Sequence, residues 1–519
     1  MTVTETLTRR LSIASFAAAI GLLLLPNAGL AQTKGEITIA GPLFNQHNDP
    51  TLLVSTANNL TGDFIYDGLL NLGPDGKYPA LATGWKISAD GKQIDFDLRK
   101  GVKFHNGDPF TAEDVKFTYE KIIDASNTHS YRKAFVDSLE RVDVLDPHKV
   151  RLVLKQPWPG FFASLRYGVQ PIVPKAYYEK VGAKGFQENP VGTGPFKFAG
   201  TKAGEWNRFE ANPNYWGGMP AVKAVTHRVV KEPFTLYAMV EKGEVDIAAG
   251  LSGALLDRVS GNPKLKLFTS RYSGTSAMYF NKTKFPEAKD KNVRLAVGHA
   301  LNRAEVARKL LNGVCEPAAS ILTPGTFGFL PGLPQLPYDP AKSKKLLADA
   351  GIKPGHEITY TIQTDSFPSL PNAPQVLEAF AGNLEAVGFK VTREPYEGNA
   401  WLAMMRARKQ PAVFYGPSSI PDDGGETLGT WYISSTMWSA GNIAQPRYDA
   451  IFNEQLQAID LKAREKLLQE FARLEEANRE TIPLFWCHTV FVAGSRIKDW
   501  KPALGSGYNF NLKSAKLAE

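Results

Sequence analysis

The chain has 519 residues, a length that suggests about three domains. Its formal net charge is +8 at pH 7, and its lysines and arginines are scattered among acidic residues instead of being clustered. This distribution argues against a nucleic-acid-binding surface and favours an ordinary mixed surface in contact with solvent.

Residues 1–31 have the pattern of a secretory signal peptide. Arg9 and Arg10 precede an apolar run over 11–25, which Pro26 ends before it reaches the length of a membrane-spanning helix. The phenylalanine expected after a twin-arginine pair is missing, so the general secretory route is favoured. No cysteine at the cleavage point could receive a lipid. We therefore expect a soluble protein in the periplasm of a double-membraned bacterium.

The stretch over 94–122 predicts a strand, a turn and a capped helix. Residues 94–98 alternate apolar and polar side chains as a half-buried strand does, and an Asn-Gly turn signal follows. Thr111 stands three residues ahead of Asp114 and just before apolar residues at helical spacing, which indicates a capping box. His105 has no second histidine or nucleophile nearby, so we interpret this stretch as scaffold rather than as a catalytic loop.

The second half of the chain alternates helical and strand patterns. Helices are expected over 340–350 and 373–387, strands over 357–364 and 389–396, and two further helical stretches over 447–480. Such alternation is typical of parallel strands joined by crossover helices, so we expect an α/β fold.

Cys315 and Cys487 are the two cysteines of the chain, and export would place them in an oxidising compartment. Two alternatives stay open. A disulfide over that span would restrict the unfolded chain by about 5 kcal/mol through loop-closure entropy. Two buried thiols are the other alternative, because Cys487 lies in the apolar run IPLFWCHTVFVAG.

The sequence shows no pattern typical of an enzyme, a metal site or a cofactor site. The eight histidines include no pair at the spacing of zinc ligands, and no nucleophile elbow of the form G-x-S-x-G occurs. The segment VGTGPFK, 191–197, lacks the hydroxyl residue of a phosphate loop, and Pro195 would block its helix. We predict a turn into a strand there, and a protein that is not an enzyme.

A family resemblance is carried by six segments in order along the chain: DPTLLVSTANNLTGDFIYDGLLNLGPDGKYPALATGWKIS (49–88), LRKGVKFHNGDPFTAEDVKFTYEKI (98–122), PVGTGPFKF (190–198), ANPNYWGGMPAVKAV (211–225), VEKGEVDIAAG (240–250) and KNVRLAVGHALNRAEVARKLLNG (291–313). Together they resemble the peptide, opine and nickel class of extracytoplasmic solute-binding proteins. These proteins are the receptors of ATP-binding cassette importers.

The resemblance implies a bilobal periplasmic-binding-protein fold with a hinge and an extra domain inserted in the first lobe. Carried onto this chain, it gives a first lobe over 36–74, 191–270 and 482–519, an extra domain over 75–190, and a second lobe over 271–481. The hinge would lie near SAMYFN and TIPLFW, because these strands cross between the lobes in the family's arrangement.

Two loops carry candidate ligand-binding residues. The first, FNQHNDP, follows the strand EITIA, where the family's chain passes the cleft; a solvated turn is the alternative. Its donors and acceptors are Asn45, Gln46, His47 and Asn48. The second loop, 414–438, is rich in aromatic residues, which favour contact with a ligand, although core packing would also explain each of them. These aromatic residues are Tyr415, Trp431, Tyr432 and Trp438.

The second loop departs from the family pattern in one respect. Dipeptide receptors of the family usually place an acid after the glycine that Gly416 resembles, to hold the ligand's ammonium group, whereas this chain has Pro417. Asp422 or Asp423 could substitute. Neighbouring side chains of an extended loop point opposite ways, so we expect only one of them to face the cleft.

We therefore predict a monomeric periplasmic receptor that captures a di- or oligopeptide-like solute between two lobes. It would deliver the solute to the membrane permease and ATPase of an importer, and it would bind no nucleic acid. An opine, a sugar conjugate or a nickel chelate stays open as the solute. A chaperone-like or chemoreceptor-docking protein and a secreted hydrolase are the less favoured alternatives.

Overall fold

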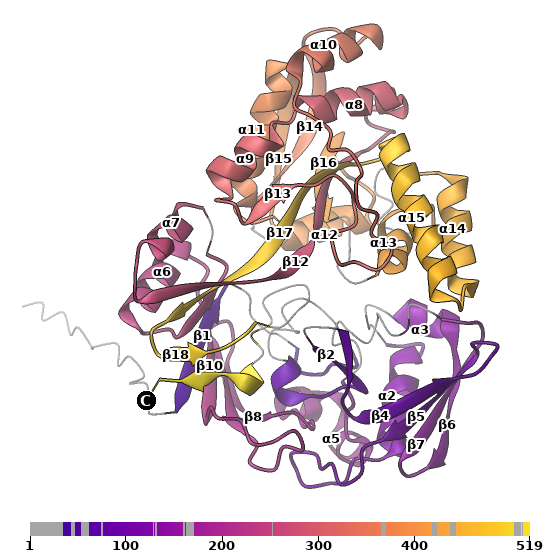
Figure 1. The fold of residues 1–519 in the computed structure, drawn as a ribbon, viewed down its shortest axis with the longest axis vertical. Helices are drawn as coiled ribbons and strands as arrows, with labels where there is room; N and C mark the ends of the chain where they lie inside the picture. The colour runs from indigo at the N-terminus through magenta and orange to yellow at the C-terminus, as the bar shows by residue number, and fades with distance from the viewer. Residues whose placement is uncertain are drawn as a thin grey trace, which may run out of the picture.

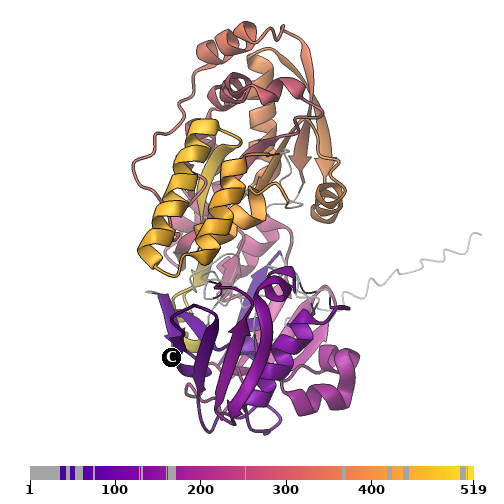
Figure 2. The same ribbon diagram turned by 90° about the vertical axis from the view of Figure 1, so that its right-hand side faces the viewer.

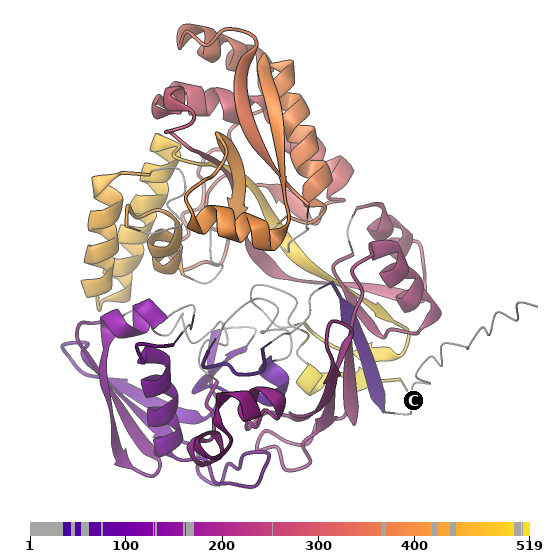
Figure 3. The same cartoon turned by 180° about the vertical axis from the view of Figure 1, so that it is seen from behind.

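The structure is a computed structural model that describes residues 35–42, 47–52, 62–73, 76–127, 129, 132–158, 161, 171–251, 253–364, 370–417, 423–435, 443–502, 510 and 512–518. The predicted signal peptide lies outside these residues. Within them, no helix is both long and apolar enough to cross a membrane. Figures 1 and 3 show, from opposite sides, two bodies joined by two long strands, β12 (Leu265–Phe280) and β17 (Ile482–Gly494).

The largest sheet runs through both bodies, in the order β15-β14-β16-β12-β17-β11-β1-β10-β9-β8, and β13 (Cys315–Pro317) also pairs with β17. β1 lies parallel to β10 and β11 in one body, and β14 lies parallel to β15 and β16 in the other. The expected parallel pairing and α/β class are therefore confirmed. The bounds of these strands are β1 (Glu36–Gly41), β8 (Phe196–Lys202), β9 (Trp206–Ala211), β10 (Ala224–Val229), β11 (Ile247–Ala249), β14 (His356–Gln363), β15 (Phe389–Tyr396) and β16 (Val413–Pro417).

The body that contains β1 has a hydrophobic core on each face of the sheet. Leu236 and Val240 of α6 and Leu255 of α7 pack on one face. Ile37 and Ile39 of β1 face the other core, which includes residues near the C-terminus. The elements that complete this body are α6 (Pro233–Lys242), α7 (Ala254–Ser260), β18 (Ile497–Asp499), the 3₁₀ turn η3 (Leu512–Ser514) and β19 (Lys516–Leu517).

The other body contains β14, β15 and β16, and we call it the second lobe; its helices follow the sequence pattern. α11 (Ala373–Ala386) connects the parallel strands β14 and β15, and buries Val376, Leu377, Phe380 and Leu384 at helical spacing. The predicted helices over 340–350 and 447–480 are confirmed as α10, α14 and α15. The helices of this body are the 3₁₀ turn η2 (Pro286–Lys289), α8 (Lys291–Ala300), α9 (Arg303–Leu310), α10 (Pro340–Asp349), α11, α12 (Gly398–Arg406), α13 (Gly424–Trp431), α14 (Pro446–Gln457) and α15 (Leu461–Asn478).

A separate antiparallel sheet, in the order β4-β5-β7-β6, has its own core and lies below α14 and α15 in Figure 2. Phe96 of β5 and Tyr119 of α2 are both buried in that core. The Thr111 backbone N–H donates to the Asp114 carboxylate at 2.8 Å, as the capping box predicts. The elements are β4 (Ala82–Ile87), β5 (Gln93–Leu98), α2 (Ala112–Ile123), α3 (Arg132–Ser138), β6 (Leu139–Asp146), β7 (Lys149–Leu154), α5 (Lys175–Glu188) and the hairpin β2 (Leu70–Gly73) and β3 (Gly76–Pro79).

His105, in the segment between β5 and α2, contacts the backbone of the loop before β8 through its ring. Its Nε2 lies 3.0 Å from the Gly194 carbonyl oxygen, and the Gly192 N–H donates to its Nδ1 at 3.3 Å. Burial lowers the pKa of His105 to about 4, so the ring is neutral. Gly192 lets the loop before β8 lie close to the backbone at Ile65, because a Cβ at position 192 would be 2.1 Å from the Ile65 carbonyl oxygen. These contacts confirm the scaffold interpretation of His105 and the turn into a strand at 191–197.

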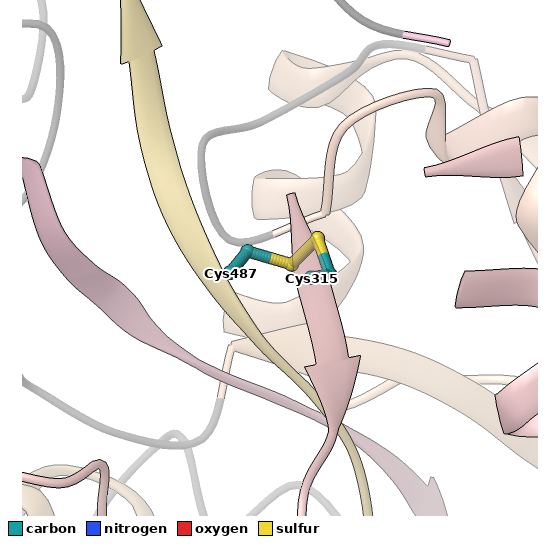
Figure 4. The surroundings of a disulfide bond; sticks show 2 residues. All are labelled: Cys315 and Cys487. Carbon is teal, nitrogen blue, oxygen red and sulfur yellow. A yellow bond between two sulfur atoms is a disulfide. The ribbon is translucent and has the colours of Figure 1, made fainter. Parts of the chain in front are cut away.

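Cys315 and Cys487 form a disulfide, which decides between the two alternatives (Figure 4). The bond joins β13 to β17, where the two cysteines lie opposite each other in the strand register. It ties a short strand of the second lobe to one of the two strands that cross between the bodies.

Candidate ligand-binding site

The loop after β1 is held by α5. Asn48 donates its backbone N–H to Gln187 Oε1 at 2.8 Å and its side-chain amide to the Gln187 carbonyl at 3.0 Å. Asp49 accepts from the Thr51 N–H at 2.9 Å and from the Tyr178 hydroxyl. The Asn48 amide is therefore used to hold the loop, whereas the neighbouring His47 is exposed. The candidates Asn45 and Gln46 lie outside the described residues.

Most of the aromatic candidates that the structure describes are core residues. Tyr415 on β16 is 1% exposed, and its ring lies in the main core of the second lobe. Tyr432 is fully buried, and its ring packs edge-on against Phe471. Trp431 is 9% exposed and belongs to the same cluster of buried residues. Tyr415 and Tyr432 are therefore core residues, which is the alternative stated above for the aromatic residues of this loop. Trp438 lies outside the described residues.

Asp423 has a structural role in the second lobe. Its carboxylate caps α13 by accepting the Gly425 N–H at 2.7 Å. It also accepts two hydrogen bonds from the Arg464 guanidinium, at 2.6 and 2.7 Å. Both side chains are nearly fully buried, so this carboxylate is directed into the lobe. Asp422 lies outside the described residues.

Glu426, one turn into α13, is an acid that the sequence analysis did not single out. Its side chain is half-buried. Burial raises the pKa of Glu426 to about 7, with a further contribution from Asp423, while Arg464 acts in the opposite direction. Glu426 could have been found from the sequence by its position three residues after the capping residue Asp423. An acid at that position usually stabilises the N-terminus of a helix.

Four side chains on β12, β13 and β17 form a second group, which we call the hinge cluster: Tyr272, Glu316, Trp486 and His488. Strand pairing places Tyr272 opposite His488 and Glu316 opposite Trp486. The Tyr272 ring stacks on His488 with centroids 4.3 Å apart and lies 6.1 Å from the Trp486 ring. The Tyr272 hydroxyl donates to the Glu316 carboxylate.

Backbone carbonyls fix the orientation of two of these rings. Trp486 donates its indole N–H to the Ser320 carbonyl at 2.9 Å, and His488 Nδ1 lies 2.9 Å from the Ser270 carbonyl. Burial and the Glu316 carboxylate raise the pKa of Tyr272 to about 12, so the hydroxyl keeps its proton. The sequence signal for this cluster was W-x-H in a strand, because alternate residues share one face.

The part of the chain that the structure describes contains no group of three or more side chains able to hold a metal ion. One open pocket of about 490 Å³ lies beside η2 and is lined by Lys282, Thr283, Pro286, Lys289 and Ala444. Its Lys282 forms an ion pair with the buried Glu480. None of the candidate site residues lines this pocket.

Residues 77–439 match the family described as bacterial extracellular solute-binding proteins, family 5 Middle. The chain belongs to this family. Members of family 5 are solute receptors, not enzymes. Heme-binding protein A of Haemophilus influenzae is 28% identical over 81% of this chain and 81% of its own length. Di/tripeptide-binding protein 2 of Pseudomonas aeruginosa is 28% identical over 69% of this chain and 72% of its own length.

Two solved family 5 structures show the same fold. A Helicobacter pylori periplasmic binding protein in complex with the peptide STSA aligns over 93% of this chain and 98% of its own, with a TM-score of 0.81 and 24% identity. A Campylobacter jejuni protein in complex with Ni(L-His) aligns over 93% of this chain and 100% of its own, with a TM-score of 0.82 and 22% identity. The bilobal periplasmic-binding-protein fold expected from the sequence is therefore confirmed.

Proposed function

We propose that this protein is the periplasmic receptor of an ATP-binding cassette importer, and that it captures a peptide-like solute between its lobes. The observation that carries the proposal is family 5 membership in a chain whose two bodies are joined by β12 and β17. Several relatives are named di- or tripeptide-binding proteins. Others are named heme- and nickel-binding proteins, so both heme and nickel chelates belong in any ligand screen.

The lobes close over the solute by bending at the strands that cross between them. The β12–β17 ladder has register shifts between Thr269 and Tyr272, between Tyr272 and Thr275, and between Ser276 and Ala277. Interrupted pairing at these positions favours bending there, next to the predicted hinge segments SAMYFN and TIPLFW. The domain boundaries given above, with the extra domain over 75–190, belong to the same proposal.

Solute contacts come from both lobes. On the first, we propose His47 with its neighbours Asn45 and Gln46. On the second, we propose Asp422, Trp431 and Trp438. Asn48, Tyr415, Tyr432 and Asp423 have the supporting contacts described above, and they act by positioning these loops. The mature protein starts after a signal peptide, acts as a monomer, and delivers its solute to a permease and ATPase.

Two measurements test the proposal. Mass spectrometry of small molecules released from protein purified from its native periplasm should identify a bound solute. Small-angle scattering with that solute should then show a smaller radius of gyration than without it. A protein that carries no solute, binds none of the peptides, opines, heme or nickel chelates in a screen, and does not contract would not be this receptor.

A further inference from the structure

The hinge cluster lies where the two crossing strands pass from one body to the other. On one side of it, Phe268 pairs with Phe491, whose ring lies in the core of the first body. On the other side, Ser276 pairs with Phe485, in the core of the second lobe. Tyr272, Trp486 and His488 therefore lie on the crossing strands between the two cores, and Glu316 lies beside them on β13. In the proposed closure these crossing strands would bend.

Glu316 gives this cluster a negative charge that no ion pair with another described residue balances. Its carboxylate is exposed, and its hydrogen-bond partner is the neutral Tyr272 hydroxyl. Among the described residues, no lysine, arginine or histidine forms an ion pair with Glu316. Exposed carboxylates elsewhere, such as Glu357 with Lys390 and Glu305 with Lys309, do have such partners.

The aromatic rings beside Glu316 would add to the attraction for a cation. Electron-rich ring faces attract ammonium groups, and a carboxylate next to a ring supplies a charge-assisted hydrogen bond. The rings are held in place: Tyr272 stacks on His488, and the Trp486 ring has Phe329 edge-on at 5.9 Å. Trp486 is 8% exposed, so the ring that a positively charged amine would meet beside the exposed Glu316 carboxylate is mainly that of the partly exposed Tyr272.

We propose that the hinge cluster binds the protonated amine of the solute, with the ammonium group on Glu316 and the adjoining carbon atoms against Tyr272 and Trp486. This inference rests on the proposed receptor function and narrows the solute to one with a free amine, such as a peptide with an unblocked N-terminus. Glu316 would supply the acid that is absent at position 417, where this chain has Pro417. Asp423 does not supply it, because its carboxylate is hydrogen-bonded to Arg464. Lobe closure would shield the carboxylate from water and so strengthen the contact.

A double-mutant cycle between protein and ligand tests this contact. We would measure by calorimetry the binding of dialanine, trialanine and their N-acetylated forms to the wild type and to Glu316→Gln. Gln retains an acceptor for the Tyr272 hydroxyl but has no charge. We expect Glu316→Gln to weaken binding of the free-amine peptides by about tenfold to a hundredfold. N-acetylation should weaken wild-type binding similarly, and the two changes together should cost little more than either alone.

Glu357→Gln is the matched control, because it removes an exposed carboxylate from β14, outside the hinge cluster. It should bind every peptide as the wild type does. Thermal unfolding checks that both variants fold. Tyr272→Leu, which removes the ring and keeps Glu316, should also weaken the binding of free-amine peptides.

Equal affinity of wild type and Glu316→Gln for a free-amine peptide would overturn this inference and leave the receptor function intact. A wild type that binds no free-amine peptide, or that releases only amine-free solutes in mass spectrometry, also overturns it; the absence of any solute contradicts the receptor function as well.

Discussion

At the scale of single residues, the buried pair of Asp423 and Arg464 gives a direct prediction. Asp423→Asn would leave the Arg464 guanidinium buried without its charge partner, a change that costs about 3 to 5 kcal/mol in comparable pairs. We expect the second lobe to unfold at a lower denaturant concentration. Asp449→Asn, which removes an acid that accepts from Ser434 at the surface, should have little effect. Equal unfolding curves for the two variants would show that the Arg464 contact contributes little.

We expect the buried carboxyl group of Glu475 to make the free energy of unfolding depend on pH. It accepts hydrogen bonds from Tyr448 and Thr481 in the interior, and burial raises its pKa from 4.5 to about 7, with a further contribution from Glu480. The folded state therefore holds this proton more tightly than the unfolded chain. The resulting stabilisation is complete below pH 4.5 and is lost as the pH rises through 7. It amounts to at most about 3 kcal/mol.

Unfolding by denaturant at pH 5 and pH 8 measures this contribution. Glu475→Gln should lose less stability than the wild type between the two pH values, because its amide does not titrate. Glu476→Gln is the neighbouring control; its carboxylate pairs with Arg479 and is partly exposed. If Glu475→Gln and the wild type changed equally with pH, the Glu475 carboxyl would titrate as an ordinary surface group.

At the scale of elements, local patterns predicted what local physics determines. The alternation at 94–98 and the helical spacing of α11 arise because one face of the strand or helix is buried in a core. The cap at Thr111 depends only on residues within the first turn of α2. Contacts between distant residues could not be predicted in this way. Asp423 is 41 residues from Arg464, and Tyr272 is 44 residues from Glu316. Only the pairing of β13 with β17 and the packing of α15 on α13 bring these partners together, so the structural role of Asp423 and the hinge cluster were missed.

The disulfide between β13 and β17 predicts a stability effect that depends on redox state. Because it closes a loop over a sequence separation of 172 residues, its loss should lower the free energy of unfolding by up to about 5 kcal/mol. Denaturant unfolding of the wild type, with and without reductant, and of the variant with both Cys315→Ala and Cys487→Ala would measure it. The reduced wild type and the variant should agree. A variant as stable as the oxidised wild type would mean that β13 stays on β17 without the bond.

At the scale of the whole molecule, the two bodies meet at a second place besides β12 and β17. The tip between α14 and α15 reaches the smaller sheet: a side chain on Gly91 would lie 3.0 Å from the Ile459 Cδ1 and 3.1 Å from Pro157. Beside it, the Gln457 amide lies 3.4 Å from Gln156 Oε1. Figure 2 shows these helices directly above that sheet. The contact spans the two bodies on the side away from α6 and α7 in Figure 1.

This second contact should restrain the opening of the lobes. Ile459→Asp would place a charge against the apolar surface of Gly91 and Pro157, and we expect a larger radius of gyration for the ligand-free protein in small-angle scattering. Leu461→Asp, two residues further along the same tip and 62% exposed, is the matched control and should scatter as the wild type does. Both changes add the same charge to the same tip, so a difference between them reports the contact itself. If Ile459→Asp left the scattering unchanged, the separation of the two bodies would be set by β12 and β17 alone, and the tip would touch the smaller sheet without holding it.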